Sequence, residues 1–168
     1  MSTPYKDILD RAIFRFSDLK LARMNEVDQY FILQKYLESA VSDFQSKCAV
    51  DLTQRVESQH TDVAYDGISD YASVGSAASD LSDGFVEDLS GEEQEILALG
   101  VAYYWLSAQI LNSELLKNKL STKDYQYFSP ANLMREIQTL RDSVRKEYRD
   151  RIVRYTYDHG DLAMEGNI

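Results

Sequence analysis

The chain has 168 residues, of which 44% are hydrophobic and 27% charged, a balance typical of one folded domain and not of a disordered chain. Its 28 acidic and 18 basic residues give a net charge of −10. This charge excludes a protein that wraps nucleic acid through phosphate contacts, although an acidic passage through which DNA slides stays open. With only two prolines and seven glycines, the sequence favours long helices over a turn-rich sandwich or barrel.

Two helices are predicted in the first fifty residues. Thr3 and Pro4 are typical of a helix start, because threonine can cap free amides and proline fits the first helical position. Asn25 is predicted to cap a second helix over about 26–49, whose apolar residues recur every three or four positions. The first helix carries its apolar stripe on Tyr5, Ile8, Leu9, Ala12, Ile13 and Phe16.

Residues 51–90 predict a long loop rich in serine, aspartate and glycine. Across 51–95 there are twelve carboxylates and a single basic residue, Arg55, so this stretch has a net charge of −11 and accounts for the whole charge of the molecule. A long segment without a helical stripe inside a compact domain is either functional or disordered. Short strands at 63–65 and 68–74 are a further interpretation of the same residues.

Two more helices are predicted in the second half. Ser90–Glu93 has the pattern of a capping box, in which serine and glutamate each bond the other's backbone amide. The helix over about 91–112 is apolar nearly all round, so it is central to a core or shared with a subunit contact. Ser129 and Pro130 open a last helix over about 130–156, with seven basic and four acidic residues, and a flexible tail follows.

Residues suited to catalysis are scarce. The only histidines are His60 and His159, and Cys48 lies at helical spacing from Phe44, which predicts a core thiol. One Glu57-x-x-His60 pattern is present, whereas a di-iron bundle needs two with two further glutamates. The glycines of the acidic stretch do not fit a calcium loop, and no glycine-rich phosphate loop is present. We therefore expect no catalytic residue, metal or cofactor.

The cysteine count and the length of the apolar runs indicate the cellular compartment. Cys48 cannot form an internal disulfide, so nothing points to an oxidising compartment. The longest nearly apolar run, Ile96–Leu106, is too short to span a bilayer, and the N-terminus has no apolar signal core. We expect a soluble protein made inside the cell, without a membrane partner.

Three features favour a binding role. Tyr103, Tyr104 and Trp105 are consecutive, so at least one is expected to meet another chain, with internal packing as the alternative. The basic helix and the acidic loop suit a head-to-tail ring, or they are two solvated surfaces that never meet. The tail either anchors on a partner or frays. The candidate interface residues are Tyr103, Tyr104, Trp105, Arg145, Arg149, Tyr155, Tyr157, Leu162, Met164 and Ile168.

Four short segments carry a resemblance to a known family. They are Leu89–Glu93, Tyr104–Leu106, Tyr127–Leu133 and Leu140–Arg141, with the sequences LSGEE, YWL, YFSPANL and LR. These capping and packing patterns resemble the head–tail connector proteins, also called adaptor or neck proteins, of tailed bacteriophages. The resemblance covers residues 88–157.

The resemblance implies an all-α fold, a small helical bundle over 1–156 with a C-terminal tail over 157–168. Such proteins form a homo-oligomeric ring, typically of twelve copies, beneath the portal protein of the virion. The ring extends the channel through which double-stranded DNA passes, and it docks the next neck, stopper or tail protein. The family has no catalytic residues or cofactors, and its C-terminal segments reach onto the portal, which here concerns Tyr155–Ile168.

Within this interpretation the acidic loop is expected to face the channel or a neighbouring subunit, where it repels DNA phosphates. Its candidate residues are Asp62, Asp66, Asp70, Asp80 and Asp83. Two other functions stay open: an intracellular adaptor outside any virion that binds a partner through its aromatic helix, and a helical-bundle enzyme that holds a metal in the acidic segment.

Overall fold

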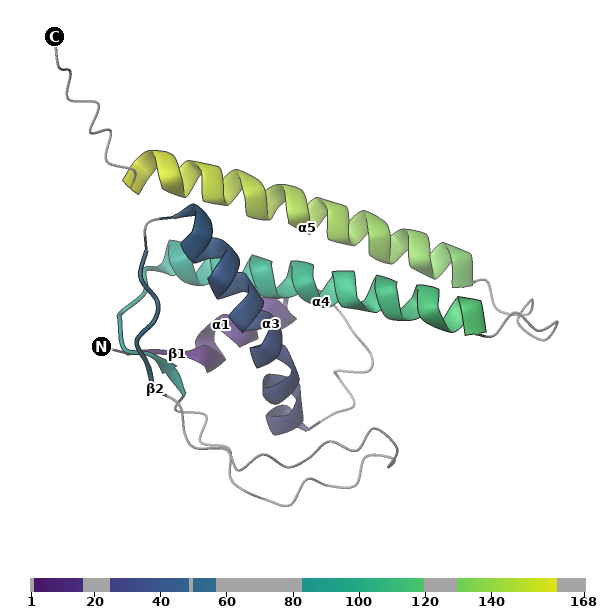
Figure 1. The fold of residues 1–168 in the computed structure, drawn as a ribbon, viewed down its shortest axis with the longest axis horizontal. Helices are drawn as coiled ribbons and strands as arrows, with labels where there is room; N and C mark the ends of the chain where they lie inside the picture. The colour runs from purple at the N-terminus through teal and green to yellow at the C-terminus, as the bar shows by residue number, and fades with distance from the viewer. Residues whose placement is uncertain (1, 17–24, 49, 57–82, 120–129, 160–168) are drawn as a thin grey trace, which may run out of the picture.

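The computed structural model describes residues 2–16, 25–48, 50–56, 83–119 and 130–159. Four helices and three two-residue strands make up this part of the chain (Figure 1). In chain order they are β1 (Thr3–Pro4), α1 (Tyr5–Ile13), α3 (Glu26–Lys47), β2 (Arg55–Val56), β3 (Gly84–Phe85), α4 (Gly91–Lys119) and α5 (Pro130–His159). The predicted all-α bundle is confirmed.

The central element is α4, which packs against α1, α3 and α5 (Figure 1). Its residues 96–102 are all buried, and Ile96, Leu99 and Val101 have no exposed surface. Three neighbouring helices explain why this sequence is apolar all round, because each of its faces needs an apolar partner. The sequence left two positions open for this helix, the centre of the core or a contact shared with another subunit. For residues 96–102 the structure supports the centre of the core.

Helices α4 and α5 run antiparallel as a long pair, with the N-terminus of α4 beside the C-terminus of α5 (Figure 1). Both are longer than predicted, since α4 continues to Lys119 and α5 to His159. Helix α5 thus continues three residues into the segment predicted as a tail from residue 157, and residues 160–168 lie outside the described residues. No glycine or proline interrupts 156–159, and the Thr156 hydroxyl donates to the carbonyl oxygen of Ile152 at 2.5 Å.

Two predicted helix starts are confirmed in atomic detail. The amide of Glu93 donates to the Ser90 hydroxyl at 3.2 Å, and the amide of Ser90 donates to the Glu93 carboxylate at 2.7 Å. At the start of α3 the Asn25 side chain accepts from the amide of Asp28 at 2.8 Å. These bonds satisfy amides that have no partner inside the helix, so they set where each helix begins.

The start of α1 differs from the prediction. Thr3 and Pro4 form strand β1, and the Thr3 hydroxyl accepts from the buried amide of Leu89 at 2.7 Å instead of capping the helix. A capping hydroxyl bonds the amides of the next turn, but here a segment 86 positions along the chain competes for the same oxygen. The tertiary contact therefore replaces the local one.

A small antiparallel sheet joins the N-terminus to both ends of the predicted acidic loop. The strand order is β1-β3-β2, with Thr3 opposite Phe85 and Arg55 also opposite Phe85. The prediction of a loop throughout 51–90 is therefore wrong at its two ends. Gly84 lies in the central strand, where an added Cβ would lie 2.4 Å from the Thr3 carbonyl oxygen. The strands proposed at 63–65 and 68–74 lie outside the described residues.

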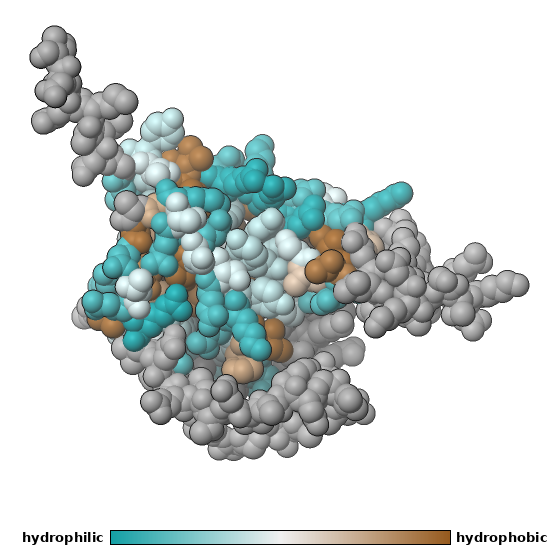
Figure 2. Space-filling view, viewed as in Figure 1, coloured by the Kyte–Doolittle hydropathy of each residue, from teal (hydrophilic) through white to brown (hydrophobic). Residues whose placement is uncertain are grey.

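Tyrosine side chains link helices at the border of the core. Tyr30 of α3 donates to the carboxylate of Asp10 in α1, and Tyr148 of α5 donates to Asp43 in α3 at 3.0 Å. These hydroxyls satisfy their hydrogen bonds while the rings stay buried. The face in Figure 2 is mostly hydrophilic, with separate brown patches. The exposed large hydrophobic residues are Phe14, Phe31, Val86, Leu111, Leu140, Val153 and Tyr157.

Candidate functional site

The aromatic triplet of α4 packs mainly inside the bundle. Trp105 is 5% exposed, with its ring stacked 6.0 Å from Phe16 and edge-on to Tyr36 at 5.5 Å. Tyr103 and Tyr104 are half-buried and pack edge to face at 5.1 Å. The alternative of internal packing thus accounts for Trp105, because these ring contacts come from Phe16, just beyond α1, and from α3 of the same chain. Only the two tyrosines keep surface that a partner can reach.

Tyr155 also belongs to the core. Its side chain is 5% exposed, its ring lies 5.3 Å from that of Phe44, and its hydroxyl donates to Glu93 at 2.6 Å. Burial, and then the hydrogen bond to the Glu93 carboxylate, raise the pKa of Tyr155. The place predicted for it at a partner interface is taken by α3 and α4. Tyr157, two residues later, is 74% exposed and stays available to a partner.

The predicted basic residues of α5 are at the surface. Arg145 and Arg149 are exposed and form no ion pair within 4.0 Å among the described residues. In contrast, Arg151 pairs with Glu147 of the preceding turn at 3.1 Å. Unpaired arginines on one helix are available to bind carboxylates of a partner.

Most of the predicted acidic residues and the end of the tail lie outside the described part of the chain. Asp83 is described, and it is 6% exposed beside β3, where its carbonyl oxygen accepts from the amide of Tyr5 at 2.8 Å. Asp83 is thus buried within the single chain, and the prediction that it faces a channel or a neighbour stays a prediction. The undescribed candidates are Asp62, Asp66, Asp70, Asp80, Leu162, Met164 and Ile168.

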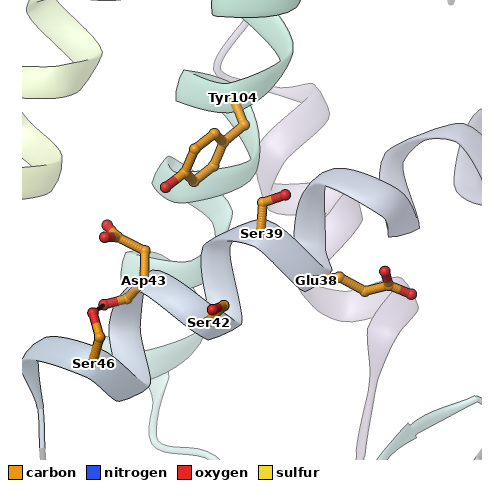
Figure 3. A pocket seen from close by; sticks show the side chains of 6 residues that line it. All are labelled: Glu38, Ser39, Ser42, Asp43, Ser46 and Tyr104. Atoms are coloured by element: carbon orange, nitrogen blue, oxygen red, sulfur yellow. Dashed lines mark hydrogen bonds between the residues drawn. The ribbon is translucent and has the colours of Figure 1, made fainter.

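An open groove of about 580 Å³ runs along α3 beside α4. Figure 3 shows the hydroxyl of Tyr104 and the carboxylate of Asp43 directed toward the same space. The lining consists of carboxylates and hydroxyls: Glu38, Ser39, Ser42, Asp43, Ser46 and Tyr104. We call this surface the α3 groove. The sequence analysis missed it, although serine and acidic residues at helical spacing along α3 were a visible signal.

The α3 groove is rich in hydrogen-bond acceptors. Asp43 accepts from Lys47 at 2.6 Å and from Tyr148 at 3.0 Å, both through one carboxylate oxygen. Glu38 is exposed and has no hydrogen bond or ion pair among the described residues. The Ser46 hydroxyl donates to the Asp43 carbonyl oxygen at 2.7 Å, so its own oxygen can still accept. The natural ligand for such a surface is a cation with several donors.

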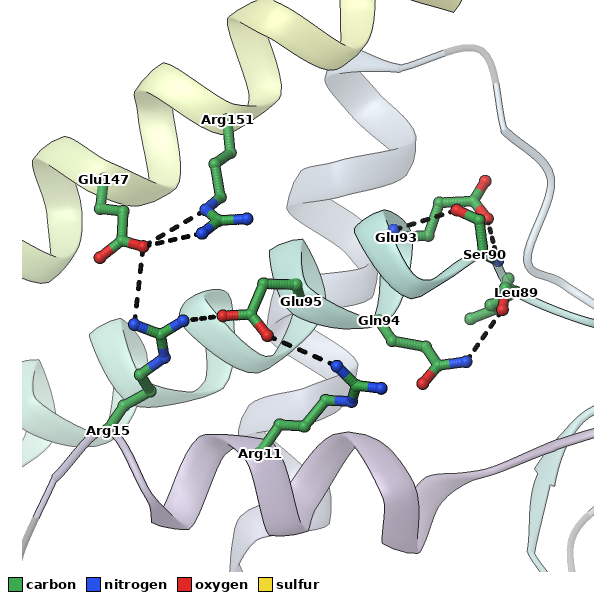
Figure 4. A network of polar contacts seen from close by, with 9 residues as sticks. All are labelled: Arg11, Arg15, Leu89, Ser90, Glu93, Gln94, Glu95, Glu147 and Arg151. Atoms are coloured by element: carbon green, nitrogen blue, oxygen red, sulfur yellow. Dashed lines mark hydrogen bonds and ion pairs between the residues drawn. The ribbon is translucent and has the colours of Figure 1, made fainter.

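A charged network holds α1 against the long helix pair (Figure 4). Arg11 and Arg15 both pair with Glu95 of α4, Arg11 at 3.7 Å. Arg15 also lies 3.6 Å from Glu147, which binds Arg151. No nucleophile or histidine belongs to this network. We assign it a structural role, because its charges neutralise one another across three helices.

The remaining titratable groups do not form a reactive centre in the described part of the chain. Burial raises the pKa of the Cys48 thiol, which keeps it protonated and unreactive. No group of three or more histidine, cysteine, aspartate or glutamate side chains in the described ranges is placed to hold a metal ion. Glu57 and His60, the one metal-like pair in the sequence, lie outside those ranges.

Comparisons with known proteins identify no relative of this chain. A scan against protein-family models and searches of curated proteins and solved structures found no match. Among the described helices none is long and apolar enough to cross a membrane. Function is therefore argued from the surfaces of the bundle and from the resemblance of residues 88–157.

Proposed function

We propose that this chain is the repeating subunit of a head–tail connector ring in a tailed bacteriophage. The ring sits beneath the portal at the head–tail interface of the virion, extends the DNA channel and docks the next neck or tail component. The segments that resemble this family belong largely to α4 and α5. Among their described residues Leu89, Trp105 and Leu106 are buried, whereas Leu140 is exposed.

The observation that carries the proposal is the charge on the outside of this bundle. Arg145 and Arg149 on α5 and Glu38 on α3 are all exposed, and none has an ionic partner among the described residues. Opposite charges on different helices suit a contact in which one face of a subunit meets another face of its neighbour. Repeating such a contact closes a ring when the rotation between subunits permits it.

The acidic segment suits the inside of a DNA channel. The net charge of −11 over residues 51–95 would repel DNA phosphates and keep the duplex from sticking. Because Asp83 is buried, we assign this role to the acidic residues between 57 and 82. Strands β2 and β3, which flank residues 57–82, pair with each other, and β3 also pairs with β1 near the N-terminus.

The portal contact falls to the end of the chain. Tyr155 is part of the core, whereas Tyr157 is exposed at the end of α5, and residues 160–168 follow it. We therefore assign portal binding to residues from Tyr157 onward. The adaptor alternative depends on the aromatic triplet of α4, whose last residue Trp105 is buried, so no observation favours that function over the connector.

The proposal is tested by mixing the purified chain with portal rings of the same phage and imaging the product by electron microscopy. We expect a second ring of density on the portal. A chain that ends at His159 should keep its helical circular dichroism but lose portal binding, because it retains α5 and lacks the end of the tail. A chain that stays monomeric with portal rings at every concentration, or that turns over a substrate, would refute the connector function.

A further inference from the structure

We propose that the α3 groove of one subunit receives Arg154 of the neighbouring subunit, with Val153 and Tyr157 beside it. This inference rests on the proposed ring and names the contact that builds it. Val153, Arg154 and Tyr157 form an exposed group on the last turns of α5, which we call the α5 patch. The occupant of the groove is thus a second copy of this chain.

The groove has the chemistry that a guanidinium group requires. Glu38 is an exposed carboxylate without a partner among the described residues, and Asp43 accepts its bonds from Lys47 and Tyr148 through one carboxylate oxygen, Oδ2. Tyr104 adds an aromatic ring at the side of the groove (Figure 3). Arginine has five donors and a planar cation that stacks on aromatic rings, so it can use both the acceptors and the ring.

The α5 patch has the composition of an interface anchor. Val153 is 52% exposed and Tyr157 is 74% exposed, at positions one turn apart. Arg154 is exposed, and it forms no ion pair within 4.0 Å with Asp150 or Asp158, although each lies one helical turn away. Tyrosine and arginine dominate the binding energy of many protein interfaces.

The α5 patch is not on the side of α5 that faces α3 and its groove. Tyr148 is on the side that faces α3, because it bonds Asp43. Glu147 is on the side that faces Arg15, two residues beyond α1, and Arg154 follows Glu147 by two turns on that side. The patch therefore points away from the groove of its own chain. A neighbour placed head to tail can join the two surfaces, as a ring requires.

The contact is tested first by cysteine cross-linking in the full chain. Ser42→Cys places a thiol in the groove and Asp158→Cys places one beside Arg154, while the buried Cys48 stays as an internal control. A mixture of the two single variants should form a disulfide dimer on mild oxidation, and the double variant should form a ladder of oligomers. The matched control, Ser42→Cys mixed with Arg135→Cys, should not, because Arg135 lies near the other end of α5.

Charge reversal then tests the ion pair itself. Glu38→Arg and Arg154→Glu should each lower the oligomeric fraction about tenfold, because each brings like charges together. The double variant should restore assembly, and Arg135→Glu should assemble like the unmodified chain. Assembly is measured by native mass spectrometry and electron microscopy, with and without portal rings.

The outcomes separate this contact from the proposed function. Rings that form on the portal without cross-links and without an effect of either reversal would overturn the contact and leave the connector function standing. Failure to assemble on portal rings would overturn both. A ladder in the double-cysteine variant, together with rescue by the double reversal, would establish the groove as the subunit interface.

Discussion

Adding one methyl group at Gly100 tests how closely α3 packs on α4. A Cβ at Gly100 would lie 2.7 Å from the Cβ of Ala40 and 3.4 Å from the ring of Tyr148. Carbon atoms in contact prefer about 3.5–4.0 Å, so Gly100→Ala requires the two helices to separate. Ala40 cannot give way by changing its rotamer, since it has no side-chain torsion that moves a heavy atom.

Two opposing effects decide the result. Replacing glycine by alanine inside a helix stabilises it by about 1 kcal/mol. Overpacking a filled core destabilises by about 1–3 kcal/mol, and the short distance to Ala40 argues for the upper half of this range. We expect a net loss of about 1 kcal/mol in the free energy of unfolding and a melting temperature lower by about 2–4 °C.

Urea unfolding followed by circular dichroism measures this change, and two further variants interpret it. Gly91→Ala makes the same chemical change at the start of α4, where an added Cβ meets nothing within 4 Å, so its stability should not fall. Ala40→Gly combined with Gly100→Ala should recover much of the loss, because it reopens the contact. If Gly100→Ala is as stable as the unmodified chain or more so, the close approach of α3 and α4 is wrong.

Three further predictions concern bonds and packing that only the folded chain makes. Thr3→Val should lower the free energy of unfolding by about 1–3 kcal/mol, because the buried amide of Leu89 loses its acceptor; equal urea midpoints for the two chains would contradict this. Burial works to raise the pKa of Glu93, but hydrogen bonds from Tyr155 and Ser90 outweigh it and hold that pKa below its ordinary value of 4.5. A carboxyl group whose pKa is lowered by folding stabilises the protein above its unfolded pKa, and this stability is lost as the pH falls through its folded pKa. The urea concentration at half-unfolding should therefore decrease as the pH falls below about 4.5, and it should decrease less in Glu93→Gln. Trp105→Ala should lower the free energy of unfolding in urea by about 3–5 kcal/mol, because the ring is part of the core. A smaller change together with lost partner binding would instead indicate that the ring belongs to an interface.

Local signals predicted the starts of two helices well. Asn25 and the Ser90–Glu93 pair cap their helices as expected, because these bonds join residues only three positions apart. The same reasoning failed at Thr3, whose hydroxyl bonds the distant Leu89. A capping residue thus indicates a helix start only when no remote donor competes for its oxygen.

The candidate surface was predicted in part. Arg145 and Arg149 were predicted on the basic side of the last helix and are exposed, because the polar side of an amphipathic helix can be read from residue spacing. Tyr157, predicted as part of the tail, is exposed at the end of α5. Trp105 and Tyr155 were placed among the interface residues, but both are buried. An aromatic residue suits a core and an interface equally well, so its type does not decide between them.

The amino-acid sequence by itself determined the all-α class, the apolar character of the helix over 91–112 and the concentration of negative charge in 51–95. These properties depend on composition and on spacing along one helix, which need no knowledge of neighbours. The small sheet, the Glu95 network and the α3 groove were decided by the tertiary structure alone. Each brings together side chains or strands from distant parts of the chain, and such contacts depend on how the helices pack and not on any local pattern.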